Sequence, residues 1–276
     1  MSLRQWVGVP EGSPRITVDG VDLAYHRSGA GVPVLCLSAI GHGGGDFADL
    51  SRRLEPGFEI IALDWPGHGR SGGDLEPLSP MRFAELAMGL ITALGLNRPI
   101  ILGNSIGGAA AILVAQQVPV RGLVLCDAGG LVKVDAAVGL FCRVFEALFA
   151  AGARGAWWFP SVYRAYYRHI VLPRPAARVQ RERIIAAGPE IAGSLRQAWA
   201  GFGRPSADIR QIAMELEVPI WVAWARQDRV IPLSRCMTTI RSLKRGTLTR
   251  FEGGHSAFME DPEAFGQGFR AFARGL

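Results

Sequence analysis

Residues 99–114 constrain the fold of this chain more than any other stretch. A short apolar run of strand type, Pro-Ile-Ile-Leu, leads into Gly-Asn-Ser-Ile-Gly-Gly at 103–108, and an alanine-rich run of helical type follows. A serine on so tight a strand-to-helix turn has a strained backbone, and Gly103 and Gly107 let neighbouring backbone pass close. The pattern predicts that Ser105 is lifted clear of a sheet edge as a nucleophile. The Ile106 N–H, at the start of the helix, would then help to stabilise an oxyanion.

The same Gly-x-Ser-x-Gly pattern recurs at 69–73, so the pattern alone is weak evidence in a chain with 35 glycines. Context separates the two. Ser71 is followed by Asp-Leu-Glu-Pro, which does not begin a buried helix, whereas Ser105 has a strand before it and a helix after it. The alternative interpretation of residues 103–107 is a tight structural turn.

Strands and helices alternate along most of the chain. From 131 to about 206 no strand appears, only helical periodicity and aromatic residues. We therefore predict an α/β fold with a mostly parallel eight-stranded sheet flanked by helices, a core of 1–130 and 207–276, and a helical cap (lid) inserted at 131–206. Strands are expected at 15–19, 22–27, 33–38, 59–63, 99–104, 122–127, 218–224 and 247–251.

The net charge and the cysteine spacing indicate which classes of binding partner and which compartment to expect. The net charge of +6 comes from scattered arginines, which favours a solvated surface and no nucleic-acid partner. Neither the apolar core of a signal peptide nor a run of about 18 apolar residues occurs, so we expect no membrane partner. The four cysteines lack C-x-x-C spacing, which is typical of reduced thiols in a cytoplasmic protein. A small-molecule substrate is the expected partner, and the sequence does not indicate an oligomeric state.

A nucleophilic serine needs a base, and the base needs a partner that fixes its tautomer. His255 follows the last predicted strand and Asp228 follows the strand before it, so both belong at the same sheet edge as Ser105. The order Ser, Asp, His belongs to this sheet topology. Taken singly, they would be a surface histidine and a helix-cap aspartate. Asp127, after the strand at 122–127, is the substitute acid.

We expect neither a metal nor a cofactor. No histidine pairs with another at ligand spacing, and the glycine-rich run at 41–45 lacks the Gly-Lys-Ser/Thr ending of a phosphate loop. His68, His169 and His26 are less suited to be the base because they lie in an earlier loop, in the cap and in an early strand.

Four motifs together resemble the α/β-hydrolase superfamily, and in particular its lid-bearing branch of small esterases and carbon-carbon bond hydrolases. They are residues 103–108, 64–71 (Asp-Trp-Pro-Gly-His-Gly-Arg-Ser), 226–232 (Arg-Gln-Asp-Arg-Val-Ile-Pro), and 254–256 leading into 260–263. The serine nucleophile distinguishes the chain from the epoxide-hydrolase and haloalkane-dehalogenase branches, which have aspartate there.

One position departs from that resemblance. Ser38 and Ala39 stand where such enzymes usually have His-Gly, at the end of the third strand. The second oxyanion donor is a backbone N–H, which a side-chain change need not remove, and the resemblance assigns it to Ile40. Gly43 and Gly44 are the less favoured donors.

The cap is rich in aromatic residues, some of which we expect to roof the substrate pocket. Phe141, Phe145 and Phe149 form one helical stripe, which favours packing onto the sheet domain. An arginine pair one helical turn apart, Arg164 and Arg168, is a candidate for holding a substrate carboxylate, with solvated surface arginines as the alternative. The expected substrate contacts are Trp157, Trp158, Tyr163, Tyr167 and Arg168.

These residues together predict a cofactor-independent serine hydrolase that cleaves an ester of a small hydrophobic substrate through an acyl-enzyme on Ser105. Carbon-carbon bond hydrolysis of a diketone-like substrate is the next candidate, because Gly-Asn-Ser-x-Gly-Gly is similar to that branch. Two further candidates are a small-molecule receptor that retains the triad and a cofactor-free oxygenase in which the histidine acts as base.

Overall fold

The computed structural model describes residues 2–276, and over that range eight strands form one sheet in the order β1-β2-β4-β3-β5-β6-β7-β8. The pairs β1–β2 and β2–β4 are antiparallel, and all other neighbouring pairs are parallel. The predicted α/β fold is confirmed. The strands are β1 (Arg15–Val18), β2 (Val21–Gly29), β3 (Gly31–Leu37), β4 (Gly57–Leu63), β5 (Ile100–Asn104), β6 (Gly122–Cys126), β7 (Ile220–Ala225) and β8 (Gly246–Phe251).

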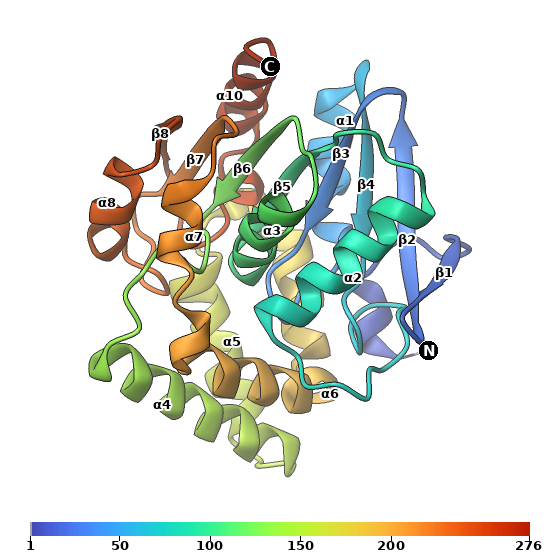
Figure 1. Ribbon diagram of the computed structural model, residues 1–276. Helices are drawn as coiled ribbons and strands as arrows, with labels where there is room; N and C mark the ends of the chain where they lie inside the picture. Colours follow the sequence, from blue (N-terminus) through green and yellow to red (C-terminus); the bar gives the residue numbers. More distant parts are fainter. Residues whose placement is uncertain (1) are drawn as a thin grey trace.

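The three strands β5, β6 and β7 form the buried centre of the sheet. Every residue of each is buried, as their uninterrupted apolar sequences predict for parallel strands covered on both faces. Because β3, β5, β6, β7 and β8 run parallel, their carboxyl ends meet along one edge of the sheet (Figure 1). That edge carries the loops that hold Ser105, Asp228 and His255.

Helices cover both faces of the sheet. α2 packs against α3 on one face, and α1 packs against α10 on the other (Figure 1). α2 begins with a capping interaction, because Ser79 accepts a hydrogen bond from the Arg82 N–H and Pro80 occupies the first turn. These helices are α1 (Ala48–Leu54), α2 (Pro80–Ala93), α3 (Ile106–Gln117), α7 (Arg210–Glu215), α8 (Leu233–Arg241), α9 (Ala257–Glu260) and α10 (Pro262–Ala273).

The cap lies at the lower end of the molecule in Figure 1 and consists of α4 (Ala136–Ala153), α5 (Phe159–Tyr166) and α6 (Arg178–Phe202). α4 packs on α6, with the Phe145 ring stacked on Trp199 at 4.5 Å between centroids. The aromatic stripe of α4 therefore faces the cap's own α6 instead of the sheet domain. That expectation is corrected, because a helical stripe shows that a face is buried without showing against what.

α4 leaves much of its apolar surface exposed. Leu140 and Val144 are 57% and 58% exposed. By length and composition alone, α4 is long and apolar enough to cross a membrane. In this structure, however, the helix packs its aromatic side on α6, and its residues Val138, Phe141 and Phe149 line the cavity described below.

Candidate active site

Ser105 lies on the turn between β5 and α3 with φ +54°, a left-handed conformation that strains a residue with a side chain. The glycines around it are required by close backbone contacts. A Cβ on Gly103 would lie 2.2 Å from the Gly107 carbonyl oxygen, and a Cβ on Gly107 would lie 2.1 Å from that of Leu37. The turn therefore has the strained geometry that the Gly-x-Ser-x-Gly pattern predicts.

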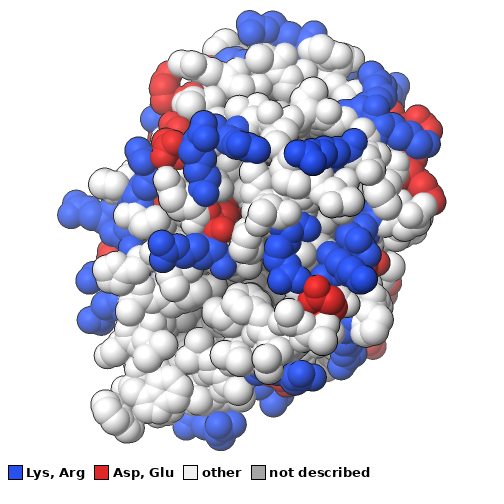
Figure 2. Space-filling view, turned by 90° about the vertical axis from the view of Figure 1, so that its left-hand side faces the viewer, with Lys and Arg blue, Asp and Glu red and all other residues white. Residues whose placement is uncertain are grey.

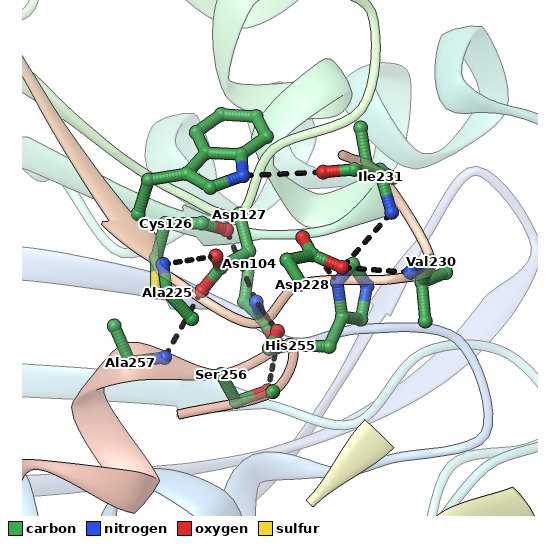
Figure 3. Close-up of polar contacts among 12 residues, drawn as sticks. Asn104, Cys126, Asp127, Ala225, Asp228, Val230, Ile231, His255, Ser256 and Ala257 are labelled. Atoms are coloured by element: carbon green, nitrogen blue, oxygen red, sulfur yellow. Dashed lines mark hydrogen bonds and ion pairs between the residues drawn. The ribbon is translucent and has the colours of Figure 1, made fainter. Parts of the chain in front are cut away.

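Asp228 and His255 form a buried pair at the ends of the two adjacent strands β7 and β8. His255 Nδ1 lies 3.0 Å from Asp228 Oδ2, and Asp228 Oδ1 accepts hydrogen bonds from the N–H groups of Val230 and Ile231 at 2.8 and 2.9 Å (Figure 3). The carboxylate is thus fixed by its own loop. It places the histidine proton on Nδ1 and leaves Nε2 for the cavity that Ser105 also lines.

Electrostatics suit His255 to accept a proton. Burial lowers its pKa, but the charge and hydrogen bond of Asp228, together with Asp127 and Glu260, raise it by more. The net pKa lies above the ordinary histidine value. Protonated His255 is therefore stabilised by its surroundings, as a general base requires.

Asp127, the substitute acid expected from the sequence, is held elsewhere. Its Oδ1 accepts from the Ala225 N–H at 2.7 Å and its Oδ2 from the Ala257 N–H at 3.0 Å (Figure 3). Burial and the neighbouring Asp228 raise the pKa of Asp127 to about 7. Asp127 thus joins β6, β7 and α9, whereas Asp228 makes the contact to the histidine.

Asn104 is a site residue to which sequence reasoning gave no role. Its side-chain amide donates to the carbonyl oxygens of Cys126 and His255 at 3.0 and 3.1 Å, and its Oδ1 accepts from Ser256 Oγ at 2.9 Å (Figure 3). It therefore ties the serine turn to the histidine loop. The available signal was an amide side chain at the end of a strand that is otherwise fully apolar.

The Ile40 N–H lies in a tight turn that begins after β3. The His42 N–H donates to the Ala39 carbonyl oxygen at 3.3 Å, and Gly41 has φ +80°, as the second central residue of a type II turn requires. His68 supports this turn, because its Nε2 accepts the Gly41 N–H at 3.0 Å. Within residues 2–276 neither the Ile40 nor the Ile106 N–H donates a hydrogen bond.

The protonation state of His68 follows from its two partners. Nδ1 donates to the Pro66 carbonyl oxygen at 2.8 Å, so Nε2 is an acceptor, and burial lowers the pKa of His68 to about 4.

The alternative oxyanion donors, Gly43 and Gly44, lie away from the site. Gly44 donates its N–H to Asp64 at 2.8 Å, and Gly43 packs against the backbone of residues 7 and 8.

Ser105, His255 and Ile40 line one cavity of about 350 Å³ between the strand ends and the cap. Its walls are mainly apolar, and Tyr167 is the one predicted substrate contact that lines it. Among the cap residues that line it without having been named as substrate contacts are Val134, Val138, Phe141, Phe149, Tyr166, Trp199 and Phe202. Their helix positions carried no signal that distinguished cavity from core.

The other four predicted contacts do not line this cavity, and the structure places each of them elsewhere. Trp157 is 89% exposed, and Tyr163 is buried against Phe159 with 5.4 Å between ring centroids. Trp158 is partly buried and packs on the core. Arg168 borders a separate groove, where it pairs with Glu182 at 2.8 Å. For Tyr163 the physical cause is helix phase, because its side of α5 packs inside the cap.

Two exposed arginines from the core, Arg229 and Arg235, also line the cavity, and Arg235 pairs with Asp135 at 2.7 Å. Figure 2 shows the face that carries α8, with more Lys and Arg than Asp and Glu and with uncharged surface at the lower left of the view. Among residues 2–276, no three His, Cys, Asp or Glu side chains are grouped as metal ligands.

Comparison with known proteins gives one consistent relationship. A family model described as "Alpha/beta hydrolase family" matches residues 26–267. The chain is 26% identical to 2-hydroxy-6-oxononadienedioate/2-hydroxy-6-oxononatrienedioate hydrolase 2 of Pseudomonas putida, over 91% of this chain and 92% of that protein. It is 28% identical to a pimeloyl-[acyl-carrier protein] methyl ester esterase of Xanthomonas oryzae pv. oryzae, over 87% and 99%. An esterase structure from Exiguobacterium antarcticum superposes with a TM-score of 0.81 at 20% identity, over 95% and 99%.

Proposed function

The chain belongs to the alpha/beta hydrolase family and is a hydrolase, and within that family we propose that it is a serine hydrolase that cleaves an ester of a small hydrophobic substrate. One observation carries the proposal. The strained Ser105 turn and the buried Asp228–His255 pair, which come from three strand ends, face one largely apolar cavity. A merely structural turn would not need a paired histidine beside it.

In the proposed mechanism, Ser105 Oγ attacks the carbonyl carbon of the ester while its proton passes to His255 Nε2. Asp228 holds the imidazole in the required tautomer and stabilises the imidazolium that forms. The N–H groups of Ile40 and Ile106 donate to the oxyanion of the tetrahedral intermediate. His255 then gives its proton to the departing alcohol, which leaves an acyl group on Ser105.

Deacylation repeats these steps with water. His255 Nε2 removes a proton from the water, the oxygen attacks the acyl carbon, and a second oxyanion forms in the same place. Its collapse breaks the bond to Ser105 Oγ, which regains the proton from His255. The products are a carboxylic acid and an alcohol, and the residues return to their initial state.

A second candidate is the hydrolysis of a carbon-carbon bond in a diketone-like substrate. The observation that favours it is the likeness to the Pseudomonas putida hydrolase together with Gly-Asn-Ser-x-Gly-Gly at 103–108. Steady-state turnover of simple aryl esters and of a vinylogous diketone separates the two. We expect clear turnover of the esters. Negligible ester cleavage with rapid diketone cleavage would contradict the ester proposal.

A further inference from the structure

The cavity contains a second buried polar cluster, separate from the catalytic pair. His42 Nδ1 lies 2.6 Å from Asp46 Oδ2, and His42 Nε2 lies 3.2 Å from the Tyr167 hydroxyl. All three residues are buried, and His42 and Tyr167 line the same cavity as Ser105. We call these three residues the His42 cluster.

The His42 cluster is held from both sides of the cavity. His42 and Asp46 follow β3 in the core, whereas Tyr167 comes from the cap. Gln180, on α6 of the cap, donates its side-chain N–H to Asp46 Oδ1 at 2.8 Å and to the Val7 carbonyl oxygen at 3.1 Å. Burying so many polar groups costs free energy unless each is paired, and this network pairs them in one fixed arrangement.

The hydrogen-bond pattern determines what the His42 cluster offers to a ligand. The Asp46 carboxylate only accepts, so His42 Nδ1 carries a proton. In the tautomer with its proton on Nδ1 alone, Nε2 accepts from the Tyr167 O–H. That bond uses the single proton of the Tyr167 hydroxyl. The Tyr167 oxygen can then only accept further hydrogen bonds, and because Tyr167 lines the cavity we infer that it matches a ligand group that donates one.

We propose that the His42 cluster is a subsite that binds a hydroxyl group on the acyl part of the substrate. His42 is two residues from Ile40, so this subsite lies beside the oxyanion loop, and the remaining apolar walls accommodate a hydrocarbon chain. The inference rests on the proposed ester hydrolysis and names its substrate class, an ester of a hydroxylated carboxylic acid. A site built to bond a hydroxyl discriminates strongly against an analogue that lacks it.

The test compares methyl hexanoate with its 2-hydroxy, 3-hydroxy and 3-oxo derivatives, with acid release measured as kcat/KM. For at least one hydroxy ester we expect the wild-type value to exceed that of methyl hexanoate by about tenfold or more, the range of one well-made hydrogen bond. In Tyr167→Phe that ratio should fall close to one. No preference for either hydroxy ester, or a preference for the 3-oxo ester alone, would overturn the proposal.

Tyr163→Phe is the matched control. It removes a hydroxyl from the neighbouring ring of the same aromatic cluster, whose centroid is 4.7 Å from that of Tyr167, and this hydroxyl does not line the cavity. We expect this variant to keep the wild-type ratio. If Tyr163→Phe and Tyr167→Phe lose the ratio equally, the effect is one of packing and the subsite is refuted. The wild-type ratios decide the matter alone should Tyr167→Phe not fold.

Calorimetric binding of hexanoate and of the 2- and 3-hydroxyhexanoates to Ser105→Ala separates this inference from the proposed function. If no ester is cleaved but a hydroxy acid binds about tenfold more tightly than hexanoate, the subsite stands and the hydrolysis of esters does not. If esters are cleaved but the three acids bind equally, the hydrolase stands and the subsite is refuted.

Discussion

The strand ends and the cap face each other across one cavity, but their polar groups are held in different ways. Asp228 is fixed by N–H groups two and three residues along its own loop, at 2.8 and 2.9 Å. Tyr167, in the cap, has its polar partner in the core, at His42. The proposed catalytic half is therefore assembled by local loop geometry on a buried sheet, whereas the proposed recognition half exists only once the cap is packed. We infer that the first half determines the reaction and the second the substrate.

Among variants that test this division, Asp228→Asn should have the largest effect on kcat. An asparagine cannot hold His255 in the same tautomer, so kcat should fall by about 10³- to 10⁴-fold with little change in stability. The matched control is Asp127→Asn, which makes the same chemical change at the neighbouring strand end. Asp127 accepts two backbone N–H bonds, so Asp127→Asn should lower the Tm. Its loss of kcat should be smaller than that of Asp228→Asn. A reversed outcome for the two variants would exchange their roles.

The next effect tests the oxyanion loop. His68→Ala removes the acceptor of the Gly41 N–H and loosens the turn that presents Ile40, so we expect kcat to fall about 100-fold with KM little changed. Far-UV circular dichroism controls for folding. A folded variant with wild-type kcat would show that this loop does not depend on His68.

The pH profile sharpens the comparison without changing the fold. The proposed base, His255, can accept a proton only when neutral, so kcat/KM should fall about tenfold per pH unit below its pKa, which is raised above the ordinary histidine value. We therefore expect the midpoint of the acidic limb above pH 6.5. Tyr167→Phe should leave the midpoint in place, whereas Asp228→Asn should move it to lower pH. A midpoint that moves only with the cap variant would contradict the division.

The smallest effects on turnover come from two tryptophans of the cap. Trp199 is 8% exposed and stacks on Phe145, so Trp199→Ala should destabilise the protein by about 3 kcal/mol and raise KM. Trp157 is 89% exposed, and Trp157→Ala should change the free energy of unfolding by no more than about 0.5 kcal/mol. Denaturant unfolding measures both. Similar losses in the two variants would show that the cap is packed differently.

The difference between the two halves also explains what the sequence allowed us to predict. Uninterrupted apolar strands, tight glycine turns and chain order are local signals, and they are enough to predict that Ser105, Asp228 and His255 share one sheet edge. The cap lacks such signals. Tyr163, on α5, lies in the cap interior, whereas Trp157, in the turn before α5, lies in solvent. Both placements depend on tertiary packing that the spacing of aromatic residues does not encode.

Buried polar pairs between segments distant in sequence could not be predicted from the sequence either. His42 and Tyr167 are 125 residues apart, and neither has a neighbour in sequence that signals the other. Asn104 combines a local sequence signal with a contact that only tertiary packing creates. Its position before the serine is a local feature, but its contact with the His255 carbonyl oxygen arises from the packing of β5 against the last loop.

The central claim, an activated serine at the β5 turn, is tested most directly by labelling with a fluorophosphonate probe and locating the modified residue by mass spectrometry. We expect stoichiometric modification of Ser105 in the wild-type protein and loss of this modification in His255→Ala. Modification of another residue, or none, would mean that Ser105 and His255 do not act together. The receptor or oxygenase alternatives would then explain the cavity better than ester hydrolysis.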